Sequence, residues 1–201
     1  YNVYLGALAA YDGMGSSNNN TAVGGRAMEK TTTGSNNTCI GRSSGGYVTT
    51  TSDNTFLGYQ AGKGKTSGTV SGANNVAIGS DCFTTMVSAS NNVVIGYRTL
   101  GGVGEQDGDN NTFIGNSIYY NAFFNGNNTT ALGNGANPSS QTVSNEITLG
   151  NSSIATLRCQ VTSITALSDQ RDKKDIETIP YGLDFVDSLQ PKKFVWDNRA
   201  E

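Results

Sequence analysis

The chain has no histidine, and charged residues make up only 14% of its 201 residues. Without histidine it cannot build a Ser-His-Asp or Cys-His catalytic triad, and it cannot supply histidine ligands to a metal. Its net charge of −3, together with the lack of a basic cluster with interleaved aromatics, argues against nucleic acid as a partner. We therefore expect no cofactor, no metal site and no nucleic-acid binding.

Long apolar stretches are missing as well. No run of 18 apolar residues occurs, so the sequence predicts no membrane insertion. Hydrophobic residues amount to 35% of the chain, below the roughly 45–50% of an ordinary globular domain. We therefore do not expect a compact core, and we predict a thin core that continues from one structural repeat to the next.

Cysteine is scarce. The three cysteines, Cys39, Cys82 and Cys159, lie far apart in the sequence, and neither a disulfide framework nor a metal-binding spacing follows from them. Cys39 and Cys82 occupy repeat positions that elsewhere hold Ala, Phe, Thr or Ser. We predict that both are small core residues.

Glycine, by contrast, is abundant, and nine of its 26 copies end a recurring pattern. In each repeat an asparagine-rich segment leads into three strand-forming residues and then a glycine, as in Asn74-Asn75-Val76-Ala77-Ile78-Gly79. These glycines are 17 to 21 residues apart: Gly6, Gly24, Gly41, Gly58, Gly79, Gly96, Gly115, Gly133 and Gly150. A period of this length is typical of a stacked solenoid.

The three residues before each glycine have the pattern of a short strand. The first is always β-branched and the third is always aliphatic, whereas the middle one ranges from Ala22 to Phe56. Because alternate residues of a strand face opposite sides, the first and third residues share one face. We predict that this uniform face is fixed by the core and that the variable residue faces outward.

The residues around each strand suggest how the chain turns. The residue three positions after each glycine is mostly small, which predicts a second, tightly packed strand or corner. The glycine itself permits φ > 0 or a close approach to a neighbouring backbone. The asparagines before each strand suit turns, where their amides can bond local backbone and stack in ladders.

The segments between repeats vary in length and content, and in solenoids such segments form loops on one face. The most aromatic one is Tyr119-Tyr120-Asn121-Ala122-Phe123-Phe124. Its aromatics would either bind a ligand or, as we favour, pack between the chains of an oligomer. Of the few acidic residues in the repeats, only Glu105, Asp107 and Asp109 cluster. A β-helical glycan hydrolase, which needs acid/base carboxylates, is therefore the least favoured function.

The composition changes sharply at Ser168. Residues 1–167 hold 15 charged side chains, whereas residues 168–201 hold 14 in a fifth of that length. Of the 26 glycines, only Gly182 lies beyond the change. We therefore predict a β-solenoid shaft over residues 1–150, a strand-rich neck over 151–167 and a second module over 168–201.

The second module opens Ser168-Asp169-Gln170-Arg171-Asp172-Lys173-Lys174-Asp175-Ile176 and continues through Leu189-Gln190-Pro191 and Phe194-Val195-Trp196. This closely resembles the start of the intramolecular chaperone of phage endosialidase tailspikes, whose pattern is Ser-Asp-x-Arg-x-Lys-x-x-Ile. The resemblance implies the N-terminal part of a helical chaperone domain. In that family the domain trimerises, templates the folding of the β-rich fibre ahead of it and then cuts itself off.

The same resemblance implies a cleavage site between Leu167 and Ser168. Ser168 would be the nucleophile, Lys173 the general base, and Asp169 would help to position the site. A lysine desolvated at an oligomer interface can have its pKa lowered enough to accept a serine proton. The alternative is that Ser168 and Asp169 cap the first helix of the module. We expect at most single-turnover autoproteolysis and no turnover of an external substrate.

The repeats are similar to the head repeats of trimeric autotransporter adhesins, which fold as left-handed parallel β-rolls with a shorter period. Together the two resemblances imply an all-β, homotrimeric, parallel β-roll or β-helix solenoid. The implied function is a structural and receptor-binding fibre or spike on a virion surface. Its partners would be its own copies, other fibre or baseplate proteins, and a host-surface glycan or receptor. The alternative is a bacterial or other extracellular trimeric adhesin.

Overall fold

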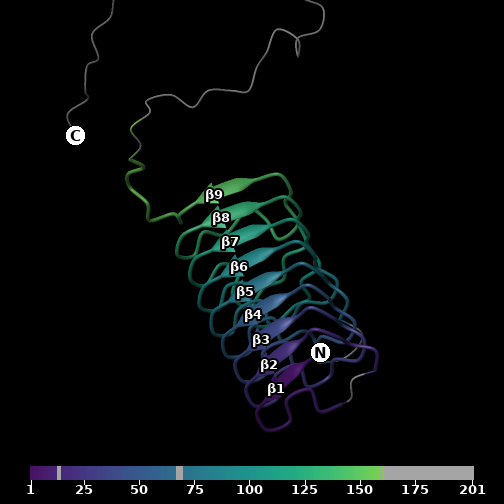
Figure 1. Cartoon of the computed structure of the whole chain (residues 1–201). Coiled ribbons are helices and arrows are strands. Elements are labelled where there is room, and N and C mark those ends of the chain that lie inside the picture. Colours follow the sequence, from purple (N-terminus) through teal and green to yellow (C-terminus); the bar gives the residue numbers. More distant parts are fainter. Residues whose placement is uncertain (13–14, 67–69, 159, 161–201) are drawn as a thin grey trace, which may run out of the picture. The chain divides into compact units, whose positions relative to one another are not determined.

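The computed structural model describes residues 1–12, 15–66, 70–158 and 160. The chain divides into two units, Tyr1–Thr156 and Leu157–Glu201, and the fold described here is that of the first. Nine three-residue strands stack into a parallel β-solenoid of about eight turns (Figure 1). They are β1 (Val3–Leu5), β2 (Thr21–Val23), β3 (Thr38–Ile40), β4 (Thr55–Leu57), β5 (Val76–Ile78), β6 (Val93–Ile95), β7 (Thr112–Ile114), β8 (Thr130–Leu132) and β9 (Ile147–Leu149). The all-β solenoid prediction is confirmed, and every strand occupies the three residues before a repeat glycine.

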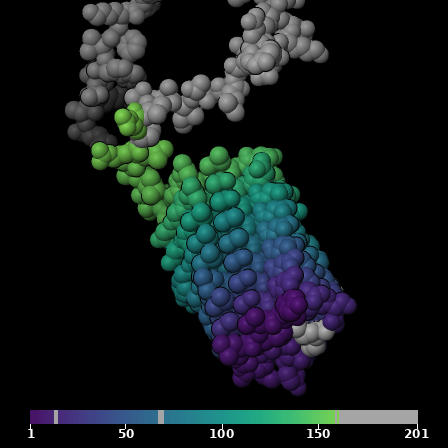
Figure 2. All heavy atoms as spheres, viewed as in Figure 1, coloured from purple at the N-terminus to yellow at the C-terminus, as the bar shows by residue number. Residues whose placement is uncertain are grey.

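Each strand pairs in parallel with the next one along the chain, in register at all three positions. In the pair β3–β4, for example, Cys39 lies opposite Phe56 and Ile40 opposite Leu57. Equivalent residues of successive turns therefore lie above one another, and rows of side chains run along the stack (Figure 2). Of the expected neck, residues 151–158 and 160 form no strand, and the rest lies outside the described residues.

The prediction about which strand face forms the core is wrong. The middle residue of β2 to β8 is fully buried, at 0% exposure, whereas the third residue is 38% exposed at Ile40 and 44% exposed at Leu57. The middle residues are Tyr4, Ala22, Cys39, Phe56, Ala77, Val94, Phe113, Ala131 and Thr148. The uniform β-branched and aliphatic columns thus face away from the interior of the chain.

In two successive turns the residue six positions after the middle one varies in the opposite sense in size. Phe56 is followed by Gly62, and a Cβ atom built on Gly62 would lie 2.4 Å from Cδ1 of Phe56. The small Ala77 is followed instead by the buried Phe83. In these two turns a large inward side chain is thus matched by a small one, as close packing favours, whereas the turn of Phe113 buries a second large ring, Tyr119.

The predicted second inward position is confirmed as a corner. Three residues after the glycine, the side chain is buried in seven successive turns: Ala27, Ser44, Ala61, Cys82, Thr99, Ile118 and Ala136. Cys39 and Cys82 are both free and buried, as predicted. Burial raises the pKa of each thiol to about 12, so both stay protonated and act as small apolar side chains.

A ladder of buried asparagines runs along the stack just before the strands, which confirms the predicted role of these amides. Asn54 shows the pattern: its Oδ1 accepts hydrogen bonds from the backbone N (2.9 Å) and Nδ2 (3.1 Å) of Asn75, one turn further on. Its own Nδ2 donates to Oδ1 of Asn37 in the preceding turn, at 3.0 Å. The residue before each ladder amide turns the chain with positive φ, as at Asn36 and Asn74. The ladder satisfies buried amide groups that would otherwise be costly.

The repeat glycine is needed both for its positive φ and for its close approach to a neighbouring backbone, as predicted. At Gly41 φ is +132°, and a Cβ there would lie 2.3 Å from the carbonyl oxygen of Gly58 in the next turn. No side chain fits between backbones stacked this closely. The glycine therefore fixes the end of each strand and the close stacking of the turns.

Candidate functional site

The residues that the sequence predicts to be catalytic have no described geometry. Ser168, Asp169 and Lys173 all lie outside the described residues. Their proposed chemistry therefore rests on the sequence alone. The described solenoid offers a different kind of site.

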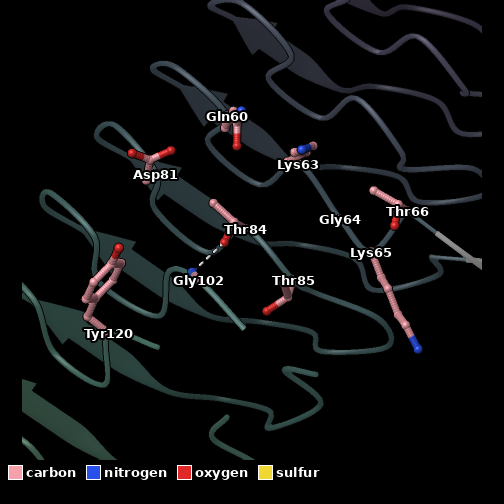
Figure 3. Close-up of a pocket in the computed structure, with 10 residues that line it drawn as sticks. All are labelled: Gln60, Lys63, Gly64, Lys65, Thr66, Asp81, Thr84, Thr85, Gly102 and Tyr120. Carbon is pink, nitrogen blue, oxygen red and sulfur yellow. Dashed lines mark hydrogen bonds between the residues drawn. The ribbon is translucent and has the colours of Figure 1, made fainter. Parts of the chain in front are cut away.

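A groove of about 300 Å³ opens on the loop side of the middle turns (Figure 3). Its lining comes from the segments that follow β4, β5, β6 and β7, so residues distant in the sequence meet because the turns stack. The ten lining residues are Gln60, Lys63, Gly64, Lys65, Thr66, Asp81, Thr84, Thr85, Gly102 and Tyr120. They include one amide, one carboxylate, two ammonium groups and four hydroxyls, one of which is on the aromatic ring of Tyr120.

Hydrogen bonds between turns hold part of this lining in place. The backbone N of Gly102 donates to Oγ1 of the buried Thr84 at 2.9 Å, a contact drawn in Figure 3. The Thr85 hydroxyl donates to the carbonyl oxygen of Gly104. Lys65 forms an ion pair with Glu105, which lies two turns further along. Contacts between turns thus hold Thr84 and Thr85 in place, and Lys65 is paired with a carboxylate outside the lining.

Tyr120 is positioned by an arginine beneath its ring. The guanidinium carbon of Arg98 lies 4.7 Å from the centre of the Tyr120 ring and 4.8 Å from the centre of the Tyr97 ring. Such cation–π contacts contribute about 0.5–1 kcal/mol at exposed sites. Tyr120 remains 37% exposed, so its ring is held at the mouth of the groove while still accessible.

A second hollow, of about 330 Å³, adjoins the first through the shared residue Thr66. Its other lining residues are Asp12, Lys30, Thr32, Tyr47 and Thr49. Lys30 forms an ion pair with Asp12, and the hydrogen bond that Lys30 donates to the Asp12 carboxylate raises the pKa of Lys30. Lys63 lies 5.5 Å from the centre of the Tyr47 ring and so lies between the two hollows.

The aromatic segment that the sequence singled out is divided between core and surface. Tyr119 and Phe124 are buried, and their rings stack with centroids 5.4 Å apart. Tyr120 and Phe123 are each 37% exposed. The two alternatives that we considered, ligand contact or contact between chains, can therefore apply only to the exposed pair. The buried pair fills the solenoid interior instead.

Each of the three clustered acidic residues contacts a different partner in the solenoid. Glu105 pairs with Lys65, Asp107 accepts hydrogen bonds from Ser88, and Asp109 accepts one from the backbone N of Ser90 at 2.7 Å.

Among the residues that the structure describes, no three His, Cys, Asp or Glu side chains come together as a metal site would require. Nor do these ranges contain a helix with the length and apolar character needed to span a bilayer.

Sequence reasoning located Tyr120 but missed the rest of the groove. Gln60 and Asp81 occupy the same repeat position, two residues after the glycine, and this regular offset was the available signal. The lysines and threonines come from spacers of irregular length, whose relative placement depends on the stacking of the turns.

The sequence profile of the family described as chaperone of endosialidase matches residues 168–201. The match begins at the serine where the composition changes, and it covers the motif on which the resemblance was based. No curated protein and no solved structure matches the chain significantly.

Proposed function

We propose that the chain is the shaft and receptor-binding part of a homotrimeric virion fibre or spike, folded by a C-terminal intramolecular chaperone. One observation carries the proposal: a chaperone-of-endosialidase match at residues 168–201 follows a nine-strand parallel solenoid in the same chain. A chaperone attached to a β-solenoid suits a protein whose task is to build a long, stable surface.

The topology explains why such a fibre would need a folding template. All eight strand pairings are parallel and join residues 17 to 21 positions apart, so no strand can form from local contacts. Non-local β pairing folds slowly and leaves strand edges open to aggregation on the way. Once stacked, only β1 and β9 lie at an edge of the sheet among the strands that the structure describes. The folded shaft would need no further help after assembly.

We further propose that the chaperone is released by self-cleavage between Leu167 and Ser168. Lys173 would take the hydroxyl proton of Ser168, and the Ser168 oxygen would replace its own amide nitrogen on the carbonyl carbon of Leu167. Water would then hydrolyse the resulting ester, leaving a shaft that ends at Leu167. Asp169 would position the two reacting side chains. The sequence resemblance and the position of the family match support these roles.

The test is a denaturing gel with mass analysis of the full-length precursor beside Ser168→Ala and Lys173→Ala. We expect the unmodified precursor to yield a product ending at Leu167 and both variants to remain whole. Lys174→Ala is the matched control, since it removes the neighbouring charge outside the motif, and it should still be cut. A precursor that stays intact under all conditions overturns self-cleavage but leaves the template role to be judged by trimer yield.

The groove is the best-supported place for receptor contact, and we propose a host-surface glycan as its ligand. Hydroxyls, an amide and a carboxylate can pair with the many hydroxyl groups of a sugar, because together they donate and accept hydrogen bonds. The accessible ring of Tyr120 adds an apolar face with a polar edge. Stacked turns also extend the site along the shaft into the second hollow, as a chain-like ligand would need.

Binding to an array of cell-surface glycans tests this assignment. We expect Tyr120→Ala and Gln60→Ala to lower binding to any glycan captured by the unmodified protein at least tenfold. The exposed Tyr11, which lies outside both hollows, supplies the control Tyr11→Ala. Equal loss in all three variants, or no loss in any, would exclude the groove as the receptor site.

A further inference from the structure

The outward faces of the nine strands form an uncharged strip along the shaft, with one aliphatic column beside a column of Thr, Val and Ile. We call it the outer strip, and it consists of the first and third residues of each strand. Its first column is Val3, Thr21, Thr38, Thr55, Val76, Val93, Thr112, Thr130 and Ile147, and its second is Leu5, Val23, Ile40, Leu57, Ile78, Ile95, Ile114, Leu132 and Leu149. The strip contains no charged residue, and every residue of its second column is aliphatic.

Neighbouring turns cover this strip only in part. Even in the middle of the stack, where residues above and below shield each side chain, Leu57 is 44% exposed and Ile114 is 40% exposed. A row of nine turns spaced by about 4.8 Å is roughly 40 Å long. Soluble monomers rarely leave a continuous apolar patch of more than a few hundred Å², and larger patches mark interaction sites.

From this geometry we infer that the outer strips of parallel copies of this chain meet along a common axis and form the inner core of the oligomer. The inference rests on the proposed trimeric fibre, and it adds which face is buried and in what register. It also explains why the outward columns are the uniform ones. A residue that packs against its own column and also against a second copy must fit two neighbours, so fewer side chains suit its position.

The spacing of the strip specifies its partner. A partner that covers the whole length must present apolar groups at the same interval of about 4.8 Å over nine steps. A second copy of the chain does so, and a globular partner has no such periodicity. Rotation about an axis parallel to the stack leaves each turn at its own height, so Leu57 meets Leu57 and Ile114 meets Ile114. Such rotation closes the assembly, as is usual for homo-oligomers.

Parallel packing also fits the position of the chaperone match. Every copy carries residues 168–201 at the same end of its sequence. A module that assembles copies of itself can act on the shafts together only if the shafts run in the same direction. An antiparallel pairing would bring Leu57 near Ile95 instead, because these residues are one turn either side of the central Ile78.

Disulfide cross-linking of the full chain tests the inference in a background of Cys39→Ala, Cys82→Ala and Cys159→Ser. Alanine already occupies the repeat positions of Cys39 and Cys82 in other turns. We expect Leu57→Cys and Ile114→Cys each to form like-with-like cross-links on oxidation. Co-expressed chains carrying one cysteine each should give no mixed cross-link, because three turns separate the two positions and a disulfide needs Cβ atoms about 4 Å apart. Val103→Cys, exposed but outside the strip, is the control and should stay uncross-linked.

The molar mass measured by light scattering shows which part of the proposal a negative cross-linking result contradicts. A trimer that cross-links at Val103→Cys but not at the strip positions overturns the inference and leaves the fibre proposal intact. A trimer in which Leu57→Cys cross-links only to Ile95→Cys overturns the parallel register. A protein with the mass of a single chain contradicts the proposed fibre and this interface together. As a second readout, Leu57→Glu should dissociate the oligomer into folded single chains, and Val103→Glu should not.

Discussion

The ring of Phe56 occupies the space into which a side chain at Gly62 would project. A Cβ built on Gly62 would lie 2.4 Å from Cδ1 of Phe56, and Gly62 has φ of +55°. Gly62→Ala therefore combines backbone strain with overpacking of the core, and we expect it to destabilise the fold by about 3 kcal/mol. Thermal and denaturant unfolding of the variant measure the loss.

Gly135 provides a matched control for this substitution. Its φ is +58°, yet the nearest atom to an added Cβ is Nδ2 of Asn151 at 3.7 Å, an ordinary contact. Gly135→Ala carries the backbone strain alone and should cost about 1 kcal/mol. Equal costs at the two glycines would show that the size matching between Phe56 and Gly62 is not what requires glycine there.

The asparagine ladder should be sensitive at any interior turn. Asn54→Ala leaves the backbone N of Asn75 without its acceptor and removes the donor to Oδ1 of Asn37. Because unsatisfied buried polar groups are costly, we expect a loss of about 3 kcal/mol. Asn116 is exposed, and Asn116→Ala should change stability by no more than about 0.5 kcal/mol. A loss at Asn54 no greater than at Asn116 would mean that the ladder contributes nothing to stability.

The two buried thiols predict a loss of stability in alkali. Burial raises the pKa of Cys39 and Cys82 from 9.0 to about 12. Below pH 9 the thiol is neutral in both states, so its contribution is complete. Above pH 9 only the unfolded state ionises freely, and stability falls by about 1.4 kcal/mol per thiol for each pH unit until the folded pKa is reached.

Comparison with Cys39→Ala/Cys82→Ala isolates this effect, since all other ionisable groups are the same in both proteins. We expect the difference in unfolding free energy between the two proteins to be constant from pH 6 to 8. Above pH 9 it should shift in favour of the double variant. A difference that stays flat to pH 11 would show that the thiols are already accessible in the folded state.

The repeat predicted much of this fold, because its physical causes are local. Each strand needs β-branched or aliphatic residues, an asparagine turn before it and a glycine after it, and all three signals lie within a few residues. Strand bounds, parallel stacking and the asparagine ladder were therefore readable from the sequence.

The sequence pattern did not predict which face of each strand is buried. Alternation shows which residues share a face, but it does not show which face meets the core. We assigned the uniform columns to the core, whereas the structure buries the variable residue. The missed signal was the inverse relation in size between Phe56 and Gly62, and between Ala77 and Phe83. The groove was beyond prediction because its residues are brought together only by the stacking of irregular spacers.

The native mass of the chain tests the central claim most directly. A parallel fibre whose outer strips are buried against one another should sediment and scatter light as three times the mass of one chain, which is 21.0 kDa when uncut. It should also keep that mass on dilution, as a continuous apolar core requires. A stable, folded particle with the mass of a single chain, in which Leu57 and Ile114 are open to solvent, would contradict the account.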